Sequence, residues 1–117
     1  MVSRGEIWWA HTPGRPGDLH QPRPVLVVSE NVRNRRLSHV LVVPIYSSAR
    51  LGPTRVEIEA GDGGLRRSSV IVCEEVSTIE QDFLDGGPLG GRVPDALLAQ
   101  VVRAIRIALG DVLASAM

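Results

Sequence analysis

The sequence predicts a mainly β protein, a small curled β-barrel covered by one C-terminal α-helix. Up to residue 80, short apolar runs rich in Val and Ile alternate with stretches rich in Gly and Pro, which is typical of an antiparallel sheet. From Asp95 onward the apolar residues change to helical spacing. A chain of 117 residues is long enough for one core and too short for two ordinary domains. Residues 1–117 are therefore predicted to form a single domain.

Five apolar runs are predicted to be strands, at residues 6–12, 25–29, 40–46, 55–59 and 70–73. Residues 55–59 alternate between charged and apolar side chains, the pattern of a strand with one wet face. Residues 25–28 and 40–43 are apolar throughout, so we expect both faces of these two strands to be covered. A further strand is predicted over residues 75–80, after a bend near Glu74.

The C-terminal segment has the pattern of an amphipathic helix. Pro94 and Asp95 are a good helix-opening pair. The apolar residues that follow repeat at helical spacing: Leu98, Val101, Val102, Ile105, Leu109 and Val112. Three more apolar residues widen this stripe: Leu97, Ile107 and Leu113. The helix is predicted to pack on the sheet, with an apolar face wide enough to reach a partner subunit.

Composition excludes several classes of protein. The net charge is zero, with 13 basic and 13 acidic residues, which argues against coating of nucleic acid by bulk electrostatics. Every basic residue is Arg, and a guanidinium can hold a phosphate in two-point contact; codon bias explains the absence of Lys equally well. The lone Cys73 excludes an internal disulfide, and with three scattered His it shows no metal-ligand spacing. No apolar stretch resembles a signal peptide or a membrane span, so a cytoplasmic protein without metal or cofactor is predicted.

The loop at residues 13–24 is the segment most suited to chemistry. It contains Asp18 and His20, and ends at Arg23 on the edge of a predicted core strand. Pro24 fixes its own φ and favours extended geometry at Arg23, which gives this arginine a stiff base from which to bind an anion. A surface salt bridge is the alternative role for Arg23.

Four segments, taken together, resemble the MazF (PemK-like) family of toxins. Residues 4–9 (RGEIWW) resemble the family's opening strand, and residues 23–29 (RPVLVVS) resemble its second strand. Residues 43–48 (VPIYSS) fall where the family has a P-(I/V)-T-S strand end, and residues 69–79 (SVIVCEEVSTI) resemble its D-S-V-(I/L)-x-x-E-Q-(I/V)-R-T-I strand. Each motif alone is weak, but the four occur in the family's order and spacing along nearly the whole chain.

The resemblance implies an SH3-like β-barrel of the CcdB/PemK type that acts as a homodimer. It implies a toxin endoribonuclease that cuts single-stranded RNA within short sequences without metal, neutralised by a MazE-like antitoxin. Attack of the 2′-OH on the adjacent phosphorus would leave a 2′,3′-cyclic phosphate and a 5′-OH. By the resemblance, Arg23 is the catalytic group, because a guanidinium can stabilise the charge that grows on the phosphorus oxygens.

At the catalytic hydroxyl the sequence departs from the family. The family's Thr falls on Tyr46, whose oxygen lies further from the backbone. Ser47 offers a short hydroxyl but should point to the other face if the strand continues. Tyr46 and Ser47 are therefore both predicted to be catalytic. Tyr46 could instead pack at a barrel mouth or stack on an unstacked base.

Further departures lie among the predicted RNA-binding residues. The loop contributes Asp18, Leu19, His20 and Gln21; Leu19 stands where the family has an amide, and His20 is either a proton carrier or a loop residue without a role. Glu75 replaces the family's Gln and Ser77 its Arg. The arginines of the loops, Arg50 among them, are candidates to offset this loss of RNA-binding groups. Trp8 and Trp9 should lie on opposite faces, one in the core and the other at the dimer interface or the RNA groove.

Three functions remain open at this point. The first is the RNA-cleaving toxin. The second is a non-catalytic poison of DNA gyrase with the same fold, like the CcdB toxins. The third is an RNA-binding module that has lost catalysis. The departures from the family at Leu19, Tyr46 and Ser77 make this hypothesis plausible. The position of Arg23 on the stiff edge of a core strand favours the nuclease, because a surface that binds gyrase does not need an arginine fixed in this way.

Overall fold

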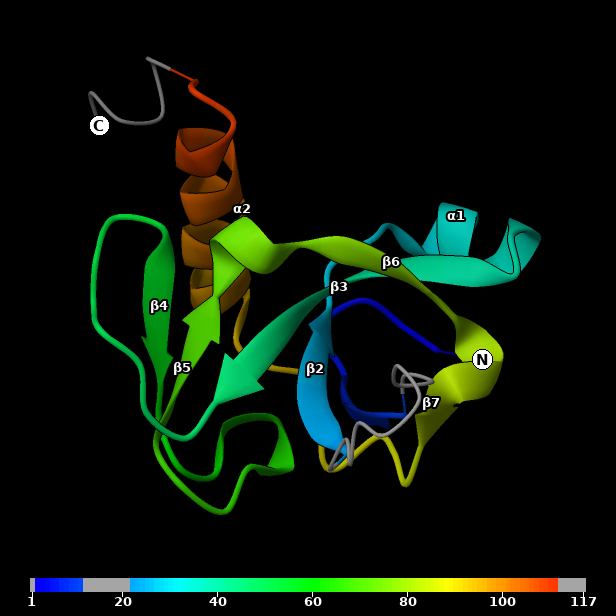
Figure 1. Ribbon diagram of the computed structural model, residues 1–117. Helices are drawn as coiled ribbons and strands as arrows, with labels where there is room; N and C mark the ends of the chain where they lie inside the picture. Colours follow the sequence, from blue (N-terminus) through cyan, green and yellow to red (C-terminus); the bar gives the residue numbers. More distant parts are fainter. Residues whose placement is uncertain (1, 12–21, 112–117) are drawn as a thin grey trace, which may run out of the picture.

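The computed structural model describes residues 2–11 and 22–111 of the chain. Its strands are β1 (Ile7–Ala10), β2 (Arg23–Val27), β3 (His39–Tyr46), β4 (Arg55–Ile58), β5 (Ser69–Val72), β6 (Ser77–Glu80) and β7 (Leu84–Asp85). The α-helices are α1 (Asn31–Arg36) and α2 (Asp95–Ala108), and three 3₁₀ turns are η1 (Asp62–Gly64), η2 (Cys73–Glu75) and η3 (Gln81–Phe83). The predicted mainly β class with a C-terminal helix is confirmed (Figure 1).

The strands form one antiparallel sheet in the order β4-β5-β3-β2-β1-β7, with β6 paired to β3 beside this path. The sheet curls but does not close, because the described pairings give β4 and β7 one neighbour each. β3 is the longest strand and holds the sheet together: β2 lies along one side of it, and β5 and β6 share the other side.

The turn η2 results from a change of register along β3. Ile45 pairs with Ile71 and Val42 pairs with Ser77, so three steps along β3 correspond to six along the facing chain. The three extra residues are those of η2, Cys73–Glu75. Cys73 is buried while the next two residues are exposed, so the extra residues project two glutamates from the sheet.

Two apolar cores lie on the two faces of the central strands. Alternate residues such as Leu26, Val43 and Ile45 face α2, whose Leu98 and Val101 are buried against them. The intervening residues form a second core on the opposite face: Val25, Val27, Val40 and Val42, with Ile79 and Leu84. β2 and β3 are therefore covered on both sides, as predicted from their apolar runs.

The helix α2 begins at the predicted opening pair, with Pro94 as its N-cap and Asp95 as its first residue, and ends at Ala108. Leu109 lies beyond the helix and is 76% exposed, so its place in the predicted buried stripe is wrong. Gly110 has a φ of +83°, a backbone conformation that ends helices readily. Val112 and Leu113 lie outside the described residues.

The short helix α1 has no counterpart among the predicted elements, and polar side chains hold it to the sheet. Asn34 is 2% exposed, and its Nδ2 donates to the Ser29 carbonyl over 3.0 Å. The Ser29 hydroxyl accepts from the Leu41 amide at 3.0 Å. The prediction that Ser29 ends a strand is wrong, because this residue instead connects β2 to α1 and β3.

Candidate active site

Arg23 and Tyr46 face each other across neighbouring strands. Val25 pairs with Pro44, so the same register extended by two residues sets Arg23 at the start of β2 opposite Tyr46 at the end of β3. The guanidinium carbon lies 4.0 Å from the centroid of the Tyr46 ring, which is a cation–π contact. Within the part of the chain that the structure describes, no carboxylate forms an ion pair with Arg23.

The hydroxyl of Tyr46 links this pair to Glu75 of the turn η2. The phenol donates to Glu75 Oε1 over 3.0 Å. Burial of the phenol raises its pKa, and the hydrogen bond and negative charge of Glu75 raise it further, against the opposing charges of Arg23 and Arg55. Tyr46 therefore remains a protonated hydrogen-bond donor at neutral pH. We call Arg23, Tyr46 and Glu75 the β2–β3 cluster.

The neighbouring Glu74 has a different set of partners. Arg55 donates to Glu74 Oε2 from Nη2 at 2.9 Å and from Nε at 3.0 Å, and the Thr54 hydroxyl donates to Oε1 at 3.0 Å. The hydrogen bonds from Arg55 lower the pKa of the Glu74 carboxyl. Glu74 is thus neutralised by a close guanidinium, whereas Glu75 accepts from a neutral phenol.

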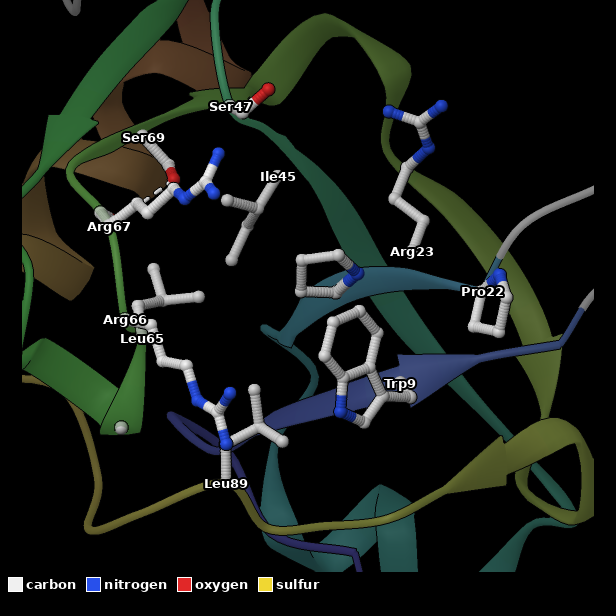
Figure 2. Close-up of a pocket in the computed structure, with 12 residues that line it drawn as sticks. Trp9, Pro22, Arg23, Ile45, Ser47, Leu65, Arg66, Arg67, Ser69 and Leu89 are labelled. Atoms are coloured by element: carbon white, nitrogen blue, oxygen red, sulfur yellow. Dashed lines mark hydrogen bonds between the residues drawn. The ribbon is translucent and has the colours of Figure 1, made fainter.

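Ser47 follows the strand and lines a cavity instead of joining the cluster. This cavity of about 610 Å³ does not include Tyr46 in its lining. Its walls are largely apolar, with arginines and serines at intervals: Trp9, Pro22, Arg23, Pro24, Ile45, Ser47, Gly64, Leu65, Arg66, Arg67, Ser69 and Leu89. In Figure 2 the Ser47 hydroxyl and the Arg23 guanidinium lie along the same side of the cavity, away from Leu89. Arg23 is common to the cavity and the cluster.

The two adjacent tryptophans lie on opposite faces, as predicted. Trp8 packs against the second core, and Trp9 is 37% exposed and lines the cavity. Trp9 therefore presents an aromatic ring in the same cavity that Arg23 lines.

The other predicted site residues are dispersed. Arg50 is exposed, and its carbonyl accepts from Arg55 Nη1 over 2.8 Å. Ser77 is exposed at the start of β6, and none of the hydrogen bonds described for the β2–β3 cluster reaches it. Asp18, Leu19, His20 and Gln21 lie outside the described residues.

Sequence reasoning missed the contact between Tyr46 and Glu75 and the ion pair between Arg55 and Glu74. The alternating pattern of residues 55–59 indicated an exposed Arg55 but gave it no partner. Among the described residues, no group of three or more His, Cys, Asp or Glu side chains is arranged to hold a metal ion. No helix in the described ranges is long and apolar enough to cross a membrane.

Comparison with known proteins gives consistent matches over most of the chain. A family model for the PemK-like, MazF-like toxin of type II toxin–antitoxin systems matches residues 3–109. Endoribonuclease EndoA of Bacillus subtilis is 30% identical over 112 residues, which cover 93% of this chain and 95% of the relative. Endoribonuclease PemK of Escherichia coli is 32% identical over 103 residues, covering 86% and 77%.

Solved structures share the fold. An endoribonuclease in complex with its cognate antitoxin, from Mycobacterial species, superposes with a TM-score of 0.77 at 26% identity, covering 94% of this chain and 96% of that one. MazF from Deinococcus radiodurans superposes with a TM-score of 0.75 at 24% identity, covering 93% and 96%.

Proposed function

The chain belongs to the PemK-like, MazF-like family of toxins of type II toxin–antitoxin systems, and from this premise we propose that it is an endoribonuclease that cuts single-stranded RNA at short specific sequences without metal. The observation that carries the proposal is the state of Arg23. It is fixed on a strand, stacked on an aromatic ring at 4.0 Å, exposed, and not neutralised by a described carboxylate. A guanidinium in this state is available for a phosphate.

The reaction needs charge stabilisation at the phosphorus. When the 2′-OH attacks in line, negative charge grows on the equatorial oxygens of the phosphate, and Arg23 can bind two of them at once. Because Tyr46 already holds the guanidinium by its flat face, little reorganisation is needed as the charge forms. The products are a 2′,3′-cyclic phosphate and a 5′-OH.

The geometry supports different tasks for Tyr46 and Ser47. The ring of Tyr46 contacts the Arg23 guanidinium, so we assign Tyr46 to the site of the reacting phosphate, where it holds the guanidinium in place. Ser47 lies with Trp9, Arg66 and Arg67 along the cavity, where RNA on either side of the cut could stack and pair its phosphates with arginine. We keep Arg50, Glu75 and Ser77 and the loop residues Asp18, Leu19, His20 and Gln21 as candidate RNA contacts.

Partners follow from the same premise. A solved relative is described in complex with its cognate antitoxin, and we propose that a MazE-like antitoxin neutralises this chain too. We propose a cytoplasmic homodimer as the active unit. The half-buried Val102 and Ile105 on α2, and the exposed Leu109 directly after it, support further contacts for this helix. Light scattering of the purified protein measures the mass directly.

Incubation of the purified protein with a long unstructured RNA in excess EDTA tests the proposed activity. We expect cuts at a short recurring sequence, with 5′-OH ends that polynucleotide kinase labels without prior phosphatase treatment. Arg23→Ala should lower the rate about 100- to 1000-fold, the usual effect of losing a preorganised donor. Arg36→Ala is the matched control, because this arginine is exposed on α1, beyond the opposite end of β2.

Other outcomes would contradict the proposal in distinguishable ways. Uncut RNA together with inhibition of DNA gyrase would indicate a gyrase poison. Uncut RNA that is retained by the protein would indicate a binding module. Cleavage that EDTA abolishes would refute the metal-independent mechanism. To separate the two hydroxyls, we expect Tyr46→Phe to lower the single-turnover rate and Ser47→Ala to weaken mainly RNA binding.

A further inference from the structure

The two glutamates of η2 differ in what neutralises them. Glu74 is held by the guanidinium of Arg55 at 2.9 Å and by the Thr54 hydroxyl. The hydrogen bond described for Glu75 comes from the Tyr46 phenol, and it reaches Oε1. Oε2 of Glu75 therefore remains available to accept a proton from an incoming group, on a side chain that is exposed to solvent.

One aromatic side chain places Glu75 beside Arg23. The Arg23 guanidinium lies over the face of the Tyr46 ring, 4.0 Å from its centroid, and Glu75 meets the hydroxyl of the same ring at 3.0 Å. The cation thus lies on the face of the phenol ring and the carboxylate at its hydroxyl, so that a single ring connects the two charged groups. A phosphodiester bound by Arg23 would lie with its ribose within reach of Glu75.

We propose that Glu75 is the general base of the cleavage reaction and that Tyr46 is the residue that positions it. The inference rests on the proposed function, and it assigns the group that starts the reaction. The 2′-OH gives its proton to the Glu75 carboxylate, and its oxygen forms a new bond to phosphorus. The bond from phosphorus to the 5′-oxygen breaks, and the leaving oxygen takes a proton from water. Glu75 then returns its proton to solvent.

The charges around Glu75 suit this task. The groups that face it are Tyr46 from β3, Arg23 from β2, Arg55 from β4 and the adjacent Glu74. Arg55 neutralises Glu74, so Arg23 is the cation that offsets the repulsion between the Glu75 carboxylate and a bound phosphate. A carboxylate so placed can lie near a bound phosphate.

The test is the pH dependence of single-turnover cleavage for the wild type, Glu75→Gln and Glu74→Gln, on an RNA that the wild type cuts. The wild-type rate should fall on the acid side as Glu75 takes up a proton. Glu75→Gln should lower the rate at neutral pH about 100-fold or more, and its rate should rise steadily with pH as hydroxide replaces the base. Glu74→Gln, the matched neighbour, should keep the acid-side fall and a rate within about tenfold of the wild type.

Binding and folding are measured on the same proteins. Affinity for an RNA with a 2′-deoxy nucleotide at the cut site should be unchanged or tighter in Glu75→Gln, because a negative charge is removed. If Glu75→Gln loses its near-ultraviolet circular dichroism, Glu75→Asp takes its place, with a lower rate but the acid-side fall retained. The proposal is overturned if Glu75→Gln keeps the wild-type pH profile, or if Glu74→Gln loses as much rate in the same way. A wild type that cuts no RNA would refute the proposed function instead.

Discussion

Replacing Gly64 with alanine tests how closely the turn η1 and residues 86–91 pack at one end of the cavity. A Cβ on Gly64 would lie 2.4 Å from both the carbonyl carbon and the oxygen of Leu89, and 2.6 Å from the Gly90 nitrogen. All three atoms are backbone, which cannot rotate away. Gly64 also has a φ of +88°, a region that residues with a Cβ rarely adopt.

Two other glycines separate these two effects. Gly61 has a φ of +100°, but a Cβ added there would have no neighbour within 4 Å, and Gly52 has neither the positive φ nor a neighbour. We expect Gly52→Ala to be neutral or to stabilise by up to about 1 kcal/mol, because alanine restricts the unfolded chain. Gly61→Ala should cost about 1–2 kcal/mol for the backbone conformation alone. Gly64→Ala adds about 1–3 kcal/mol of steric overlap.

Urea unfolding followed by tryptophan fluorescence measures all three variants. For a domain of this length, the Gly64→Ala loss corresponds to a fall in Tm of about 10 °C or more. Equal losses for Gly64→Ala and Gly61→Ala would mean that the Leu89 backbone moves aside, and the argument from steric overlap would fail. A neutral Gly61→Ala would refute the conformational part.

Three further outcomes follow from buried or paired polar groups. Burial raises the pKa of the Cys73 thiol to about 12, so Ellman's reagent should modify the protein only after unfolding. Arg55 lowers the pKa of the Glu74 carboxyl. The pair therefore stabilises the fold above the ordinary carboxyl pKa of about 4.3, and this stabilisation is lost as the pH falls through the lower pKa of the folded state. The difference in Tm between the wild type and Arg55→Gln should accordingly shrink in acid. Asn34→Ala should cost about 2–4 kcal/mol in urea unfolding, because it leaves buried partners unsatisfied; a loss below about 1 kcal/mol would contradict this.

The strands and the C-terminal helix were predictable because their signals are local. The alternation at residues 55–59 and the apolar runs in β2 and β3 report burial directly, whatever the neighbours are. The helix α1 carries no such signal, since it is six residues long and depends on the buried Asn34. An asparagine in the segment between two strands, such as Asn31 or Asn34, predicts a turn as readily as a helix. Tertiary contacts therefore decide which of the two forms.

The site was predictable only in part, because its geometry depends on register. Pro24 and the family pattern single out Arg23. Tyr46 and Ser47 do lie in different surroundings, but β3 ends at Tyr46, so strand alternation is not what separates them. The contact between Tyr46 and Glu75 depends on the three-residue change of register at η2, and no local sequence pattern predicts this change of register. The sequence departs from the family's usual residues at both positions, and the two departures are hydrogen-bonded to each other.

The titration of Tyr46 tests that contact without any assumption about catalysis. Tyr46 is the single tyrosine of the chain, so the absorbance change of phenolate near 295 nm reports this residue alone. Its pKa is raised above the ordinary value of about 10 by burial and by Glu75, and lowered by Arg23. Glu75→Gln should therefore move the midpoint down and Arg23→Gln should move it up. A raised folded pKa also means that the phenol stabilises the fold below pH 10 and loses this contribution as the pH rises through the folded value. Midpoints that shift in the same direction in both variants would refute the arrangement of guanidinium, ring and carboxylate from which the active site is argued.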